Sequence, residues 1–268
     1  MSLDNNQKSK IEKIISDALR KKLVGYKPET NHKPFHTRLL SKDWMAKYSF
    51  VQSLNTTLGV SIYEQVGEII ASKEFVYVEK QYKVGGIMYS KAQETINDIM
   101  NELSKNEDTG SDKLSETSRI NKVCQTGAEV SLKPVKADLY LKDKHDRIFL
   151  IDIKTVKPNK GDFQKMKRTL LDWLAIELAK SPNSDIHTMI AIPYNPYFPK
   201  DYKRWTVENM FDYEHELKVG EDFWNFLGGP DTYYQLLKCF EDIGLEFRER
   251  LEEHIEMLGG DYQYWTNS

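Results

Sequence analysis

Cysteine and long apolar runs are both scarce in this sequence. Only two of its 268 residues are cysteines, Cys124 and Cys239, which excludes a disulfide scaffold, and neither has a partner at zinc-ligand spacing. No apolar stretch approaches the roughly 20 residues that a transmembrane helix needs. Residues 1–22 are charged throughout and lack the apolar core of a secretory signal peptide. We therefore expect a globular protein of the cytoplasm, without membrane attachment and with two reduced, packed thiols.

A strong net charge is also lacking, since the chain sums to -3, but the charges are unevenly distributed. Residues 1–48 and residues 133–168 each carry a net charge of +6, whereas residues 205–268 carry -11. The two basic segments could face a polyanion while the acidic segment is turned away from it. A solvated, charge-rich surface would give the same counts.

Hydrophobic periodicity predicts helices and strands that alternate along the chain. Helical spacing of apolar residues predicts helices over 7–24, 43–54, 61–72, 91–104, 162–180 and 230–258. Strands are predicted over 75–82, 135–142, 147–153 and 186–192, with a turn at Gly85-Gly86 and a surface loop over 105–118. The order strand, strand, helix, strand in the middle of the chain predicts an α/β fold, a mixed sheet flanked by helices.

The two central strands bring three charged residues together. Asp138 and Asp152 each lie seven residues from His145, in the turn, so a hairpin folded about His145 places them opposite each other. Opposed residues in an antiparallel pair have Cβ atoms about 4.5–5.5 Å apart. Lys154 lies two residues beyond Asp152 and points to the same face, because side chains alternate along a strand. Two carboxylates and an ammonium group are therefore expected to converge.

This arrangement of charges is typical of a catalytic metal site. Two close carboxylates repel each other unless a positive charge lies between them, and their hard oxygens suit Mg²⁺, which also binds phosphate oxygens. A lysine beside the metal can orient a water molecule or help to deprotonate it. The alternative is an ion pair at a sheet edge. The apolar run of residues 148–151 favours the catalytic interpretation, because charges there are costly unless they are paired or metal-bound.

The residues Pro134-Val135-Lys136-Ala137-Asp138 and Asp152-Ile153-Lys154 resemble the Asp…(Asp/Glu)-x-Lys signature of the PD-(D/E)xK nuclease superfamily. The segment Thr155–Phe163 with Lys167-Arg168 resembles, more specifically, the TdeIII-like type II restriction endonucleases. Ala137 stands where the superfamily name has proline. The resemblance is strongest over about residues 54–195 and implies a restriction-endonuclease-like core within a single domain, 1–268. A helical N-terminal addition (1–53) and an acidic, mainly helical C-terminal part (205–268) would flank this core.

The resemblance implies that Asp138 and Asp152 are metal ligands and that Lys154 activates water. It also implies an additional acidic ligand on an early helix, for which Glu64 is the candidate and Glu68, one turn later, the alternative. The activity it implies is Mg²⁺-dependent hydrolysis of double-stranded DNA at a specific palindromic site, in functional pairing with a DNA methyltransferase of the same specificity. A repair or recombination nuclease, or a non-catalytic DNA- or partner-binding module, are the alternatives.

Basic and amide side chains that follow the second strand could contact DNA phosphates or bases: Lys157, Lys160, Gln164, Lys167 and Arg168. A solvated helix face would explain them nearly as well. A palindromic duplex presents two equivalent scissile phosphates, so we expect a homodimer whose twofold axis matches that of the DNA.

Overall fold

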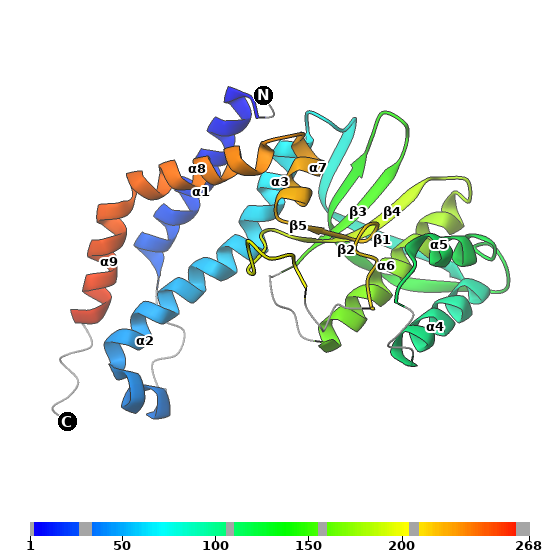
Figure 1. Ribbon diagram of the computed structural model, residues 1–268, viewed down its shortest axis with the longest axis horizontal. Coiled ribbons are helices and arrows are strands. Elements are labelled where there is room, and N and C mark those ends of the chain that lie inside the picture. Colours follow the sequence, from blue (N-terminus) through cyan, green and yellow to red (C-terminus); the bar gives the residue numbers. More distant parts are fainter. Residues whose placement is uncertain (1–2, 27–33, 106–109, 155–159, 204–208, 261–268) are drawn as a thin grey trace. The chain divides into compact units, whose positions relative to one another are not determined.

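The structure, a computed structural model, describes residues 3–26, 34–105, 110–154, 160–203 and 209–260 (Figure 1). The chain divides into two compact units. The helical unit comprises Leu3–Val66 together with the chain from Tyr234 onward, and the sheet unit comprises Gly67–Tyr233. The sequence predicts one domain with a core at about 54–195. The sheet unit contains most of that segment, and in the helical unit the helices from the two ends of the chain pack on each other. The single domain stays a prediction.

The helical unit consists of α1 (Asn5–Gly25), α2 (Pro34–Thr57), the short π-helix η1 (Leu58–Ile62), the start of α3 (Tyr63–Ala71), most of α8 (Thr232–Glu246) and α9 (Arg248–Gly260). Asp4 and Gln7 form a capping box that starts α1. The predicted helix 230–258 is interrupted between α8 and α9, where the buried Phe247 ring has the guanidinium groups of Arg20 and Arg250 at 5.6 and 5.3 Å from its centroid.

The sheet unit contains five strands in the order β1 (Tyr77–Tyr89), β2 (Glu129–Lys142), β3 (Ile148–Ile153), β4 (Ile186–Ile192) and β5 (Leu217–Val219). Strands β1, β2 and β3 pair antiparallel, whereas β3 with β4 and β4 with β5 pair parallel. Its helices are α4 (Ser90–Lys105), α5 (Lys113–Asn121), α6 (Lys160–Lys180) and α7 (Glu221–Gly228). This is the predicted α/β fold, a mixed sheet flanked by helices.

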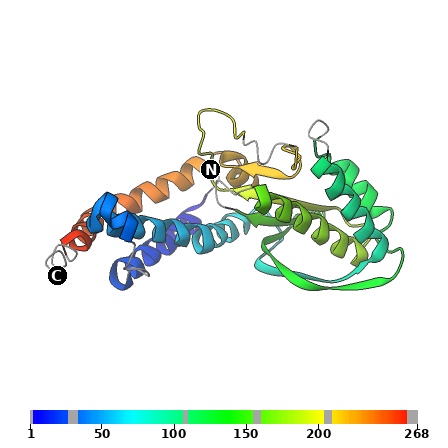
Figure 2. The same ribbon diagram turned by 90° about the horizontal axis from the view of Figure 1, so that it is seen from below.

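Both faces of the sheet are covered, which explains the continuous apolar runs in β3 and β4. Helix α6 lies along one face of the sheet (Figure 2). Its buried Trp173 and Leu174 share a core with Leu150 and Ile190. On the opposite face Phe149 contacts Phe226 of α7. Because alternate residues of β3 face opposite layers, Asp152 shares the α6 side with Leu150.

Two local predictions are corrected by the structure. Strand β1 continues through Gly85-Gly86, where the pairing with β2 shifts register instead of turning. A Cβ at Gly85 would lie 2.7 Å from Pro134 Cγ, so glycine is needed for this close approach. Within the predicted loop 105–118, α5 begins at Lys113 because Asp112 caps it by accepting from the Ser115 amide. Strand β5 and helix α7 were not predicted.

Two further sequence predictions concern cysteines and membranes. Cys124 and Cys239 are free and buried, as expected. Across the helices that the structure describes, none is long and apolar enough to cross a membrane.

Candidate active site

The hairpin of β2 and β3 has the register that the sequence predicts. Leu139 pairs with Ile151, Tyr140 with Leu150 and Leu141 with Phe149, so the next position of the ladder places Asp138 opposite Asp152. Asp143 holds the turn, since its carboxylate accepts hydrogen bonds from the His145 and Arg147 amides at 2.9 and 3.0 Å. The turn therefore sets the register that brings the two candidate metal ligands together.

The candidate site lies where β2 and β3 stop pairing through their backbones. Beyond Leu139 the Ile153 amide donates to Asp138 Oδ2 at 2.6 Å. The Lys154 ammonium donates to Asp152 Oδ1, and the Lys154 amide continues the pairing with β4 by donating to the Ala191 carbonyl at 2.9 Å. The three residues predicted to converge thus do so, at the carboxyl end of β3.

Burial makes Asp152 the electrostatically unusual member of this cluster. Its side chain is 9% exposed, whereas the side chain of Lys154 is 32% exposed. The pKa of Asp152 is raised to about 7 as the net result of burial, the opposing charge and hydrogen bond of Lys154, and the charge and hydrogen bond of Asp138, which add to the effect of burial. Burial and a second carboxylate both disfavour the negatively charged form of Asp152. A cation bound beside the two carboxylates would offset both effects.

The donor set of this cluster suits a magnesium ion. Asp138 and Asp152 provide hard carboxylate oxygens from adjacent strands, and Mg²⁺ is usually held by one or two carboxylates while it keeps several waters. Among the residues described by the structure, no group of three or more histidine, cysteine, aspartate or glutamate side chains gathers as a metal site. A closed, all-protein cage is therefore absent from this part of the chain, whereas a two-carboxylate site fits.

The two candidates for the additional acidic ligand belong to different units. Glu64 lies in the first turn of α3, in the helical unit, and is partly buried. Its role as a ligand stays a prediction. Glu68 belongs to the sheet unit, where its carboxylate pairs with the Lys80 ammonium at 2.6 Å. The pair is partly exposed, and the role of Glu68 as the alternative ligand also stays a prediction.

The predicted DNA-contacting residues differ in how much of them the structure describes and in how exposed they are. Lys157 lies outside the described residues, and the backbone of Lys160 forms the start of α6. Gln164 is partly buried on α6. Arg168 is partly exposed and donates to Asn97 at 2.6 Å and to Asp172 at 3.1 Å. No contact of these residues with DNA is tested by the structure, so their role stays a prediction.

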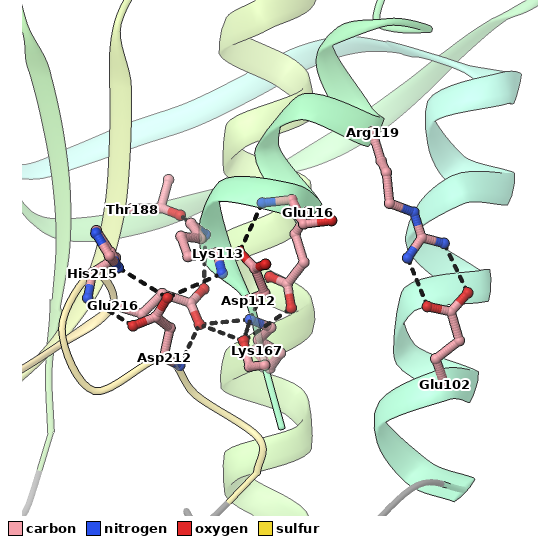
Figure 3. A network of polar contacts seen from close by, with 12 residues as sticks. Glu102, Asp112, Lys113, Glu116, Arg119, Lys167, Thr188, Asp212, His215 and Glu216 are labelled. Carbon is pink, nitrogen blue, oxygen red and sulfur yellow. Dashed lines mark hydrogen bonds and ion pairs between the residues drawn. The ribbon is translucent and has the colours of Figure 1, made fainter. Parts of the chain in front are cut away.

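The prediction for Lys167 is wrong, because its side chain is fully buried (Figure 3). Its ammonium donates to Glu116 at 2.6 Å, to Glu216 at 2.5 Å and to Ser111 at 2.8 Å. A second buried lysine, Lys113, donates to Glu216 and Thr188 at 2.8 Å each. The positive charges of two ammonium groups thus neutralise the negative charges of two carboxylates between α5, α6 and the segment before β5. A buried ammonium group is out of reach of a DNA phosphate.

The pKa values in this buried network follow from burial and pairing. Burial lowers the pKa of Lys113 and raises that of Glu116. Burial would also raise the pKa of Glu216, but Lys113 and Lys167 together hold it below its ordinary value. The network therefore ties α5, α6 and the segment before β5 to one another. The burial of Lys167 could have been predicted from the sequence, since its helical spacing places it in the apolar stripe of Phe163, Leu170 and Leu174 on α6.

Sequence reasoning missed one residue that touches the candidate site. Gln81 of β1 donates through its side-chain amide to Asp138 Oδ1 at 3.3 Å. A glutamine in a strand has no distinctive pattern, and the residue preceding Tyr82 could be connected to Asp138 only once the pairing of β1 with β2 was known.

Known proteins resemble this chain over most of its length. A family model described as "Type II restriction endonuclease, HinfI" matches residues 3–244. The type II restriction enzyme HgiCII of Herpetosiphon aurantiacus is 26% identical over 226 residues, which cover 83% of this chain and 81% of HgiCII. MjaII of Methanocaldococcus jannaschii is 29% identical over 212 residues, covering 74% of this chain and 55% of MjaII. HgiEI of Herpetosiphon aurantiacus is 25% identical over 216 residues, covering 80% of this chain and 77% of HgiEI.

These matches extend through both units and include the whole candidate site. They do not confirm the finer resemblance to the TdeIII-like enzymes, and they give no support to a repair nuclease or a non-catalytic binding module. The chain belongs to the HinfI family of type II restriction endonucleases and is a site-specific deoxyribonuclease.

Proposed function

We propose that this endonuclease hydrolyses DNA at the cluster of Asp138, Asp152 and Lys154, with Mg²⁺ as its cofactor. The observation that carries the proposal is the convergence of these three side chains where β2 and β3 separate, with Asp152 nearly buried against Lys154. Asp138 and Asp152 would hold the ion, and Glu64 is the candidate for an additional ligand. When bound, Mg²⁺ would supply positive charge and Lewis acidity at the scissile phosphate.

The side chains of the cluster have separate tasks in this proposal. Asp138 is fixed by the Ile153 amide, so its carboxylate has a defined direction. Asp152 holds the Lys154 ammonium at the end of β3. From there Lys154 would orient the attacking water and accompany the negative charge that develops on the phosphate during in-line attack.

The proposal also includes the DNA substrate, the oligomeric state and a partner enzyme. The substrate is double-stranded DNA with a palindromic site, cut by a homodimer whose two active sites are related by the twofold axis of the duplex. Lys157, Lys160, Gln164 and Arg168 would contact the DNA beyond the active site. A DNA methyltransferase of the same specificity would protect the cell's own DNA in the cytoplasm.

Incubation of purified protein with plasmid DNA tests the proposal. Discrete fragments should form with Mg²⁺ and disappear when EDTA is added, and sequencing of the fragment ends should reveal one palindromic sequence. Cutting that persists in EDTA would contradict the metal requirement, and ends without a twofold-symmetric sequence would contradict the palindromic site. Light scattering with and without cognate DNA tests the homodimer, which a strict monomer in both conditions would contradict.

A further inference from the structure

Gln81 occupies an unusual backbone conformation within a long strand. It lies near the middle of β1, yet its φ is 56°, in the left-handed region that residues other than glycine, asparagine and aspartate rarely adopt. Such conformations cost free energy and persist where surrounding contacts hold them, often at functional sites. The pairing of β1 with β2 runs from Lys80↔Leu139 to Tyr82↔Ala137, so Gln81 is the residue directly across from Asp138.

The side chain of Gln81 connects Asp138 with a lysine. Its amide nitrogen donates to Asp138 Oδ1 at 3.3 Å, and its amide oxygen accepts from the Lys136 ammonium at 3.1 Å. The orientation of the amide is determined by chemistry, because an ammonium group can only donate and a carboxylate can only accept. Rotating the amide by half a turn would set its oxygen against the carboxylate and its nitrogen against the ammonium.

We propose that Gln81 is a positioning residue for Asp138 in the proposed metal site. With Oδ2 held by the Ile153 amide and Oδ1 held by Gln81, the Asp138 carboxylate is fixed at both oxygens. The inference rests on the proposed function, since it assumes that Asp138 is a metal ligand.

The unusual backbone of Gln81 offers a variant that separates positioning from folding. Glycine adopts φ near 56° without steric cost, so Gln81→Gly removes the amide and leaves the strand conformation favourable. Asn209 is a matched control, because it also has a left-handed φ, 68°, in the sheet unit but lies outside β1, β2 and β3. Gln81→Asn keeps an amide on a residue that tolerates this conformation, but the amide is one methylene shorter.

The experiment measures three quantities for each variant: the affinity of the DNA-free protein for Mn²⁺ by electron paramagnetic resonance, the cleavage rate with Mg²⁺, and the Tm. Gln81→Gly should keep the wild-type Tm or exceed it and should lose about 10- to 100-fold in Mn²⁺ affinity, the usual effect of removing a group that orients a metal ligand. Its cleavage rate should fall at low Mg²⁺ and recover in part at high Mg²⁺. Asn209→Gly should match the wild type in Mn²⁺ affinity.

Wild-type Mn²⁺ affinity in Gln81→Gly would overturn the proposal, and so would a lowered Tm with unchanged affinity, which would assign Gln81 to strand pairing alone. Should Gln81→Gly not fold, Gln81→Asn replaces it, with weaker Mn²⁺ binding expected and wild-type binding contradicting the proposal. Failure of the proposed function has a different signature: Asp138→Ala would then cut DNA at the wild-type rate, whatever the result for Gln81→Gly.

Discussion

The Asp138 carboxylate accepts a hydrogen bond from the Ile153 amide at 2.6 Å, across the point where backbone pairing between β2 and β3 ends. One side chain thus both satisfies a backbone donor and faces the second carboxylate of the candidate site. The structural and the catalytic contributions of Asp138 can be separated by substitution.

Asp138→Asn should abolish cleavage while preserving the fold. Asparagine retains an oxygen that can accept from the Ile153 amide, but it lacks the negative charge that a divalent cation needs. We expect a Tm close to that of the wild type and a loss of cleavage of more than about 100-fold. Asp138→Ala, the control, also leaves the Ile153 amide without its acceptor and should lose about 1–3 kcal/mol of stability. Cleavage by Asp138→Asn at the wild-type rate would remove Asp138 from the site.

Lys167→Met should destabilise the sheet unit rather than weaken DNA binding. The substitution leaves Glu116 and Glu216 buried with one ammonium fewer, and breaking a buried ion pair costs about 3–5 kcal/mol. Arg168→Met, on the next residue of α6, removes a partly exposed pair with Asp172 and should cost less than about 1 kcal/mol. Urea unfolding of the two variants gives the comparison, and equal stability would contradict it.

The salt dependence of DNA binding provides the second part of that test. Each phosphate contact adds about 0.9 to the slope of log affinity against log salt. Folded Lys167→Met should keep the wild-type slope because its ammonium is buried, whereas Lys157→Ala and Lys160→Ala should each reduce it. If only Lys167→Met reduced the slope, the burial of Lys167 in the DNA-bound protein would be contradicted.

Glu64→Ala should raise the Mg²⁺ concentration needed for cleavage more than it weakens DNA binding, as expected for loss of an additional ligand. Glu68→Ala is its matched control on α3: it removes a partly exposed ion pair with Lys80, worth about 0–1 kcal/mol, and should leave cleavage almost unchanged. Cleavage measured across a Mg²⁺ titration distinguishes the two variants. The reverse result would move the additional ligand one helical turn, to Glu68.

The stability contributed by Asp143 should depend on pH in the acidic range. Burial alone would raise its pKa, but hydrogen bonds from Arg147 and His145 and the charge of Arg147 outweigh burial and lower the pKa below 3.8. A lowered pKa stabilises the fold above the unfolded value of 3.8, and this contribution is lost as the pH falls through the folded value. Asp143→Asn should therefore melt below the wild type at pH 7, with the difference shrinking at strongly acidic pH. A constant difference would contradict this origin.

The hairpin register could be predicted from sequence because a short polar turn between two clear strands fixes it, and Asp138 opposite Asp152 follows directly. The positive charge of Lys167 favoured the prediction of a DNA contact, although its position in an apolar stripe of α6 indicates burial. Helix α5 escaped prediction since its buried face includes Lys113 and Glu116, which become buried only by pairing with partners distant in sequence. Strand β5 has three residues, too few to show a period.

Gln81 shows a different limit of sequence reasoning. Its importance depends on a left-handed φ and on lying across from Asp138, and neither property leaves a mark in the sequence. Helix α2 extends from Pro34 to Thr57, well beyond the predicted segment 43–54. The helix buries Ala46 and Phe50 but leaves Trp44 and Tyr48 exposed, so its apolar residues do not mark one face. A helix with exposed aromatic residues lacks a clean apolar stripe.

Single-turnover cleavage of the cognate duplex by Asp152→Asn and Lys154→Met tests most directly whether the cluster at the end of β3 hydrolyses DNA. With enzyme in excess and Mg²⁺ saturating, each variant should cut more slowly than the wild type by at least about 100-fold, the usual loss on removing a group that acts in proton transfer or charge stabilisation. DNA affinity and Tm should stay close to wild-type values. Cleavage by either variant at the wild-type rate would contradict the assignment of these residues to the active site.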